Sequence, residues 1–360
     1  MAITGDTTWF GSTAGAASSR SALRAMRLYF IVLAFLGLAA LIFGIENRIA
    51  PTGAFLFAPP VDLVPPLSAS AWLGAFAAHQ QDPVFVACGG TESLDQFKAL
   101  YWWEWLRQAS LVALAGAVAI GLAAALLRYR FVLRWFVGPS LVVLGYFLAG
   151  AVFDVAASNV DTLIRYNVGQ YRHALGLTFA SLAIALALAT GLGAPRTTLR
   201  LPRSLAWAGV ILATASVASG ALFAARSAAA VWPSFPGYEG AALPPLDRLG
   251  GYTPLWLNLT FNPYAIQLEH RLVAFALWGV LLAALTIALH RRAPAWKALG
   301  ALFLIVTAQM ASGIAALVLG VPAVPALVHE VGGVIVLAGF FYLLLPAERD
   351  LATPVTANCH

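Results

Sequence analysis

Eight long apolar segments constrain the fold of this chain more than any other feature of its sequence. Each has about 18 residues or more, which is enough for an α-helix to cross a hydrocarbon core of about 30 Å. Hydrophobic residues make up 61% of the chain and charged residues 10%, against roughly 45–50% and 25% in soluble domains. The alternating segments of about 10 residues that mark a membrane β-barrel do not occur in the sequence. The sequence therefore predicts an all-α polytopic membrane protein whose helices cover 28–45, 109–127, 136–157, 173–192, 205–223, 272–289, 298–321 and 328–345.

The basic residues indicate how these helices are oriented. The net charge is +6, and most arginines lie before the first segment or in every second connection. Short basic connections face the cytoplasm, so we expect both termini to be cytoplasmic and the long connections 46–108 and 224–269 to face outward. The positive charge thus reflects membrane topology, with lipid as the partner, and it does not indicate binding to nucleic acid. The basic residues concerned are Arg20, Arg24, Arg27, Arg128, Arg130, Arg134, Arg196, Arg200, Arg203, Arg291, Arg292, Lys297 and Arg349.

The first 27 residues bear on localisation. They are rich in Ser and Ala and contain arginines with one acid, Asp6, a composition that faintly resembles a transit peptide. A cytoplasmic tail of a bacterial inner-membrane protein is the preferred interpretation, and the mitochondrial inner membrane is the alternative. The two cysteines, Cys88 and Cys359, are expected on opposite sides of the membrane, which excludes an intrachain disulfide.

The eight segments form an internal repeat. Segments one to four and five to eight follow the same order of long outer, short inner and short outer connections. Arg107 in the second segment corresponds to His270 in the sixth, and His173 in the fourth corresponds to His329 in the eighth. We therefore expect two tandem four-helix bundles related by a pseudo-two-fold repeat, each able to build a site between facing helices. The predicted units are a tail at 1–27, an N-terminal bundle at 28–195, a C-terminal bundle at 196–346 and a tail at 347–360.

His270 and His329 are the strongest candidate ligands. Each begins a separate membrane segment at the same edge, and histidines in membrane helices are rare and face the bundle interior. Two facing imidazoles suit an iron atom held axially in a heme. The alternative is a pair of structural histidines hydrogen-bonded near the headgroups. Arg271 follows His270 and is expected either to bind a heme propionate or to extend to the interface as a cation.

The N-terminal half has a different set of residues. His173 has no histidine partner on the second segment, because Arg107 occupies that position. A guanidinium has no lone pair for a metal, so Arg107 is expected to bind a propionate or to pair with Glu104, one helical turn away. Glu104, within the tryptophan-rich stretch 102–105, is expected to act in proton transfer or to form only a surface ion pair. Of the remaining histidines, His79 is expected to be a solvated loop residue.

The sequence resembles the heme A synthase family. The likeness runs from residue 28 to 345, and the order of its pieces along the chain is specific, although no single piece is decisive. The likeness is strongest in the residues that directly precede the sixth and eighth segments. The pieces are 47–53 (NRIAPTG), 97–105 (FKALYWWEW), 171–173 (YRH), 262–271 (NPYAIQLEHR) and 325–329 (PALVH), with Gln309 and Gly313 in the seventh segment.

The resemblance implies an activity and roles for individual residues. Heme A synthases oxidise a methyl group of heme O to a formyl group by two hydroxylations, which give a gem-diol that loses water. By this likeness His270 and His329 ligate heme b, while Glu104 and His173 belong to the half that binds the substrate, heme O. Arg107 stands where the family has its first histidine, and this is the main departure. Heme O synthase, cytochrome oxidase assembly factors and further copies of the chain are the partners implied.

Three functions fit these features. The first is an active heme A synthase that tolerates Arg107. The second is a related heme b protein without a substrate site, which serves electron transfer or heme handling. The third is a transporter or structural protein without heme, and the absence of inverted repeats and interrupted segments from the sequence disfavours it.

Overall fold

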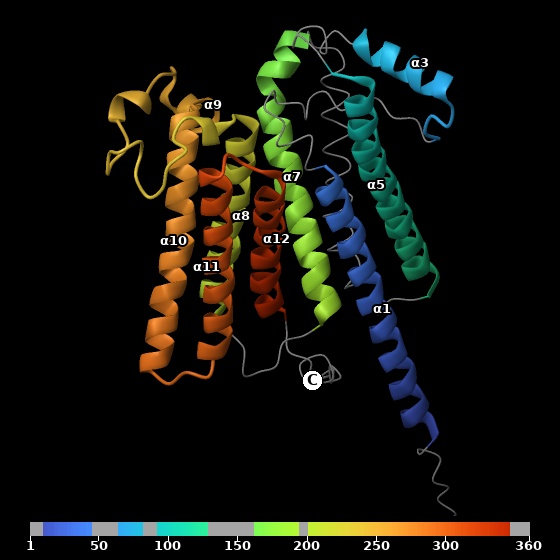
Figure 1. Ribbon diagram of the computed structural model, residues 1–360. Helices are drawn as coiled ribbons and strands as arrows, with labels where there is room; N and C mark the ends of the chain where they lie inside the picture. Colours follow the sequence, from blue (N-terminus) through green and yellow to red (C-terminus); the bar gives the residue numbers. More distant parts are fainter. Residues whose placement is uncertain (1–9, 45–63, 82–91, 129–161, 194–200, 346–360) are drawn as a thin grey trace, which may run out of the picture.

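The computed structural model describes residues 10–44, 64–81, 92–128, 162–193 and 201–345, and these are mostly helical. Within these ranges no β-strand occurs, and the only β-type pairing is an isolated bridge between Tyr238 and Ala241. The longer elements, coloured along the chain in Figure 1, are α1 (Phe10–Phe43), α3 (Ala69–Gln80), α5 (Leu94–Arg128), α7 (Thr162–Leu192), α8 (Arg203–Ala225), α9 (Asn258–Phe261), α10 (Pro263–His290), α11 (Trp296–Val318) and α12 (Ala323–Leu344).

Seven of the described helices are long and apolar enough to cross a membrane: α1, α5, α7, α8, α10, α11 and α12. They cover all or most of seven of the eight predicted segments, and the described residues confirm a helical, polytopic protein. The remaining segment, 136–157, lies outside the described residues. The eight-helix count and the repeat of four plus four helices stay predictions.

The helices begin earlier than the apolar segments within them. The helix that contains segment 109–127 begins at Leu94, and the helix that contains segment 272–289 begins at Pro263. Pro263 is favoured in the first turn, and the Asn262 side chain caps the helix by accepting a bond of 3.0 Å from the Tyr264 N–H. Hydropathy marks only the apolar part of a helix whose backbone continues into the polar headgroup region. The expectation that Arg107, His270 and His329 stand at the start of their membrane segments is therefore wrong, because each lies at least one turn inside, whereas the apolar span of α7 does begin at His173.

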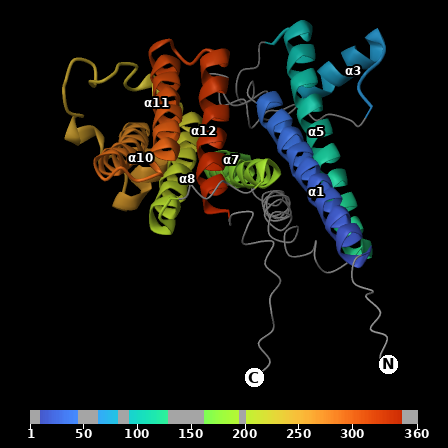
Figure 2. The ribbon, with the colours of Figure 1, turned by 90° about the horizontal axis from the view of Figure 1, so that it is seen from below.

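The central element is α7. It packs against α1 on one side and against α8 and α12 on the other, while α5 packs against α1. Helices α8, α10, α11 and α12 form a group of their own, and Figure 2 shows α7 between this group and the pair α1 and α5. Close packing of small and large residues holds such helices together in lipid. At Gly209 of α8, for example, a Cβ atom would overlap the ring of the fully buried Phe340 of α12.

Helix α3 lies within the connection 46–108 and overturns one expectation. Ser68 caps it by accepting a bond from the Ala71 N–H at 3.1 Å. Its inner face packs on Phe97 of α5, with the His79 ring centroid 5.1 Å from that of Phe97. His79 is only 5% exposed, and its Nε2 lies 3.5 Å from a Glu92 carboxylate oxygen. His79 is thus a buried packing residue, and the prediction of a solvated histidine is wrong.

Candidate functional site

Two histidines from different helices face one another in the C-terminal group. His270 lies two turns into α10 and His329 nearly two turns into α12. Their ring centroids are 6.2 Å apart and their planes are almost perpendicular, at 87°. The structure therefore brings together the two residues that the sequence singled out as a ligand pair.

The Nδ1 atoms of both rings have protein partners. His270 Nδ1 lies 3.0 Å from Ser219 Oγ of α8. His329 Nδ1 lies 3.0 Å from the Gln309 carbonyl and 3.2 Å from Ser312 Oγ, both on α11. Since each ring meets these groups through Nδ1, its Nε2 is the nitrogen available for a metal.

Glycines leave room for the two rings. A Cβ atom at Gly220 would lie 3.1 Å from His270 Cε1, and one at Gly313 would lie 2.5 Å from His329 Cε1. Each glycine directly follows one of the serines that contact the same ring. Gly313 was noted in the sequence, whereas Ser219, Gly220 and Ser312 were not. The recurrence of a Ser-Gly pair in two apolar helices, α8 and α11, is the signal that could have revealed them.

The donor set fits a heme better than a bare metal ion. Across the described parts of the chain, no group of three or more His, Cys, Asp or Glu side chains could hold a metal ion, whereas protein-bound zinc uses three or four such ligands. Two axial imidazoles suffice when a porphyrin supplies the other ligands. His270 and His329, whose ring centroids lie 6.2 Å apart, are the residues that could hold such a group.

Arg271, the next residue on α10, is buried beneath the outer connection. It is 8% exposed, and its guanidinium donates to the Ser234 carbonyl at 2.7 Å and to the Gly237 carbonyl at 3.3 Å. The guanidinium carbon lies 4.7 Å from the centre of the Tyr238 ring. Arg271 therefore does not extend outward as an interfacial cation. Its partners are neutral, so its positive charge has no carboxylate counter-ion among the described residues.

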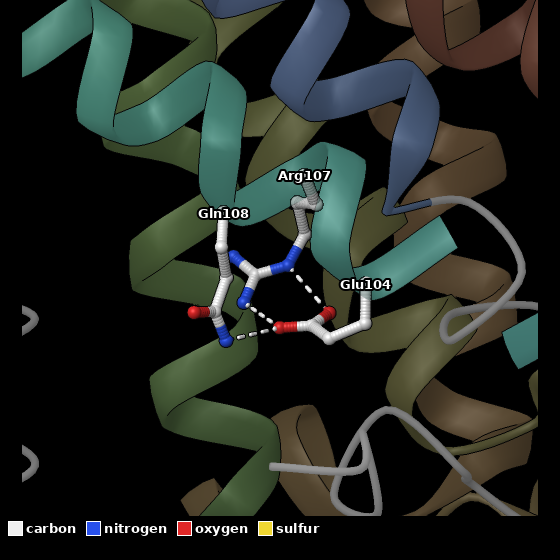
Figure 3. Close-up of polar contacts among 3 residues, drawn as sticks. All are labelled: Glu104, Arg107 and Gln108. Atoms are coloured by element: carbon white, nitrogen blue, oxygen red, sulfur yellow. Dashed lines mark hydrogen bonds and ion pairs between the residues drawn. The ribbon is translucent and has the colours of Figure 1, made fainter. Parts of the chain in front are cut away.

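Glu104 and Arg107 form an ion pair on α5, as one of the two sequence alternatives predicted. Figure 3 shows the guanidinium facing both oxygens of the carboxylate. Arg107 Nε donates to Glu104 Oε2 at 2.8 Å and a terminal nitrogen donates to Oε1, while Gln108 Nε2 donates to Oε1 at 3.0 Å. Glu104 is 1% exposed. The pair is therefore partly buried, with the carboxylate on its inner side, and is not a surface pair.

His173 lies half-buried on α7, the helix between the two groups. Two residues earlier, the Tyr171 hydroxyl lies 2.8 Å from Thr260 Oγ1, and its ring centroid lies 5.9 Å from that of Phe261. The Phe261 carbonyl accepts a bond from Arg226 Nε at 3.1 Å. The helices that carry His173 and His270 are thus joined through Tyr171 of α7 and the residues just before α10.

Comparisons with known proteins agree with these features. The family model described as "Cytochrome oxidase assembly protein" matches residues 58–341. Curated relatives include two proteins named heme A synthase from strains of Rhodopseudomonas palustris. The chain is 31% identical to that of strain CGA009 over 342 residues (90% of this chain, 89% of that protein) and 32% identical to that of strain BisA53 over 341 residues (90% and 91%). It is also 31% identical over 329 residues to a heme A synthase of Rhizobium johnstonii (87% of each chain).

Proposed function

The chain belongs to the cytochrome oxidase assembly protein family that includes the heme A synthases, and from this premise we propose that it is a heme A synthase that oxidises heme O to heme A. It is a multi-pass membrane protein with seven described helices of membrane-spanning character, and its relatives are bacterial. The observation that carries the proposal is the facing pair His270 and His329, which stands within the matched region.

In the C-terminal group, His270 and His329 are the proposed axial ligands of heme b. Heme supplies one-electron transfer when it is bound in this way. The protein's own contribution is to present two imidazoles from α10 and α12, which both pack against α8 and α11, with their Nδ1 atoms already bonded. Arg271 is the proposed partner of a propionate, because an anion there would compensate a buried cation whose described partners are all neutral.

In the N-terminal half, His173 is proposed to position or ligate the substrate heme O. Arg107 has no lone pair for iron, so this half offers His173 as its histidine, and Arg107 is proposed to hold a propionate of the substrate. Glu104 is the proposed proton-transfer group. Both of its oxygens accept N–H bonds in the structure, so Arg107 and Gln108 hold the carboxylate in place.

Arg107 also favours a second candidate function. A chain that keeps the His270–His329 pair but lacks one histidine of the substrate half suits a heme b protein of electron transfer or heme handling. The two functions share the C-terminal site and differ only in whether the N-terminal half turns over heme O.

The arrangement in the membrane is also proposed. Basic residues in alternate connections support two cytoplasmic termini in a bacterial inner membrane. The packing of α8 with α10, α11 and α12 supports a C-terminal unit at 196–346, and an N-terminal unit at 28–195 completes the proposed repeat. Heme O synthase, oxidase assembly factors and further copies of the chain are the proposed partners.

The decisive experiment identifies the hemes that the protein carries. The full chain is purified from cells that also make heme O, and its hemes are extracted and separated by chromatography with mass detection. Heme b together with heme O, a hydroxylated derivative or heme A supports a heme A synthase. Heme b alone supports the second function, and a protein without any heme contradicts both.

A further inference from the structure

A short pattern occurs twice in the C-terminal group, once beside each candidate ligand. In α8 it is Ser216, Ser219 and Gly220, and in α11 it is Gln309, Ser312 and Gly313. Each serine hydroxyl donates to the backbone carbonyl three residues earlier: Ser219 Oγ to Ser216 O at 3.2 Å, and Ser312 Oγ to Gln309 O at 2.8 Å. The two histidines therefore meet the same local arrangement on two different helices.

The direction of these bonds determines what each serine offers its histidine. A hydroxyl has one hydrogen to donate and lone pairs to accept. Since the hydrogen of Ser219 points to the Ser216 carbonyl, Ser219 Oγ can only accept from His270 Nδ1, 3.0 Å away. Ser312 Oγ likewise accepts from His329 Nδ1, and the Gln309 carbonyl is a second acceptor for that nitrogen. Both rings then carry their hydrogen on Nδ1 and expose the lone pair of Nε2.

The glycine of each pattern gives the histidine ring room beside the helix. It lies directly after the serine, where any side chain would press on the ring that the serine holds: Cε1 of His270 at Gly220 and Cε1 of His329 at Gly313. The serine therefore fixes the tautomer and one edge of the ring, while the glycine lets the ring lie close to the helix. Both serines are buried or half-buried, and Ser219 is only 2% exposed.

We propose that the Ser219-Gly220 and Ser312-Gly313 pairs are matched histidine holders, in which Ser219 and Ser312 are positioning residues that set the Nδ1–H tautomer of His270 and His329. This proposal rests on the proposed heme b site, because an axial histidine would bind iron through the lone pair of its Nε2 atom. A bond accepted from Nδ1–H also raises the basicity of the ligand. Each serine therefore tunes the electron affinity of the bound iron without touching it.

The first test measures the tautomers directly and needs no heme. The full-length protein is labelled with ¹⁵N-histidine, and NMR in membranes reports which ring nitrogen of His270 and His329 carries hydrogen. Nδ1–H forms are expected in the unaltered protein, and mixed tautomers at His270 are expected in Ser219→Ala. Nε2–H forms in the unaltered protein, or tautomers that Ser219→Ala leaves unchanged, overturn the proposal.

The second test uses the heme-loaded protein and compares Ser219→Ala and Ser312→Ala with Ser216→Ala. The control removes a hydroxyl one turn away on α8 and keeps the carbonyl that Ser219 uses. We expect heme affinity to fall about 10- to 100-fold in Ser219→Ala and the reduction potential to rise, with a smaller change in Ser312→Ala because Gln309 still accepts from His329. Ser219→Thr should restore both values. Equal reduction potentials and equal heme affinities in Ser219→Ala and Ser216→Ala overturn the proposal. If the unaltered protein carries no heme, the proposed heme site is refuted, and the NMR measurement of the tautomers decides on the role of the serines.

Discussion

The Tyr171 hydroxyl lies 2.8 Å from Thr260 Oγ1, and this hydrogen bond joins α7 to the residues that lead into α10. Tyr171 stands two residues before His173, and Thr260 stands three residues before the start of the helix that carries His270. Phe261 lies beside both, with its ring 5.9 Å from Tyr171 and its carbonyl bonded to Arg226 at the end of α8. These contacts therefore join α7, α8 and the start of α10, the helices beside the proposed substrate and heme b sites.

Tyr171→Phe tests this connection. The change removes one hydrogen bond and keeps the ring packing, so we expect the protein to lose about 0.5–1.5 kcal/mol of stability. Thermal unfolding of the detergent-purified protein measures the loss. Heme b content should stay unchanged, because neither His270 nor His329 contacts Tyr171. A Thr260→Val variant should lose at least as much, because Thr260 Oγ1 also donates to the Leu257 carbonyl at 3.3 Å. A double variant that loses the sum of the two single losses would show that the two hydroxyls act separately.

His270→Ala and His329→Ala should each lower the heme b occupancy and change its absorption spectrum, because one remaining imidazole would leave the iron without its second axial ligand. The absorbance of the heme relative to the protein measures the occupancy. His290→Ala is the matched control, since His290 lies exposed at the far end of α10. Full heme occupancy in either ligand variant, with an unchanged spectrum, would exclude the pair as axial ligands.

Substitutions at three glycines should differ in severity. In Gly313→Ala the new Cβ would lie 2.5 Å from His329 Cε1 and 2.9 Å from Nδ1, so the ring must move and its bonds to α11 break. Gly220→Ala is milder, because its closest approach to His270 is 3.1 Å. Gly279→Ala on α10 meets no atom within 4 Å and serves as the control. Heme retention during gel filtration should decrease from Gly279→Ala to Gly220→Ala to Gly313→Ala, and any other order contradicts the geometry.

The apolar segments and the closeness of His270 and His329 could be predicted from sequence because both depend on simple regularities. Membrane crossing requires long apolar helices, and two histidines at one depth in one half of a repeat point to a shared site. The hydrogen-bond partners could not be predicted in this way. Ser219 and Ser312 face the histidines because of the way α8 and α11 are rotated about their axes, and a hydropathy pattern does not give this rotation. His79 was misassigned because a polar residue in an outer connection gives no sign that a short helix buries it. The choice between the two expected roles of Arg271 depended on the course of residues 232–238, which no pattern in the sequence specifies.

Arg271→Gln should loosen the outer connection. The guanidinium donates to four backbone carbonyls between residues 232 and 237 and lies against the Tyr238 ring. A shorter neutral amide cannot reach all of them, so we expect faster cleavage of this connection by an added protease, followed by mass spectrometry of the fragments. Arg248→Gln, at a residue exposed to solvent, is the control. Equal cleavage rates in the two variants would show that Arg271 does not hold the connection.

Arg107→Ala should destabilise the protein because it leaves the buried Glu104 carboxylate without its cation. A fully buried pair that loses one partner costs about 3–5 kcal/mol, but the Arg107 side chain is 30% exposed and Gln108 still donates to Glu104, so we expect about 1–3 kcal/mol. The double variant Glu104→Gln with Arg107→Ala should recover part of this loss, since no charge is then left unpaired. Thermal unfolding of Arg107→Ala, Glu104→Gln and the double variant measures the coupling between the two residues. If Arg107→Ala also leaves heme O binding and turnover unchanged, the proposed role of Arg107 in the substrate half is wrong and the ion pair serves stability alone.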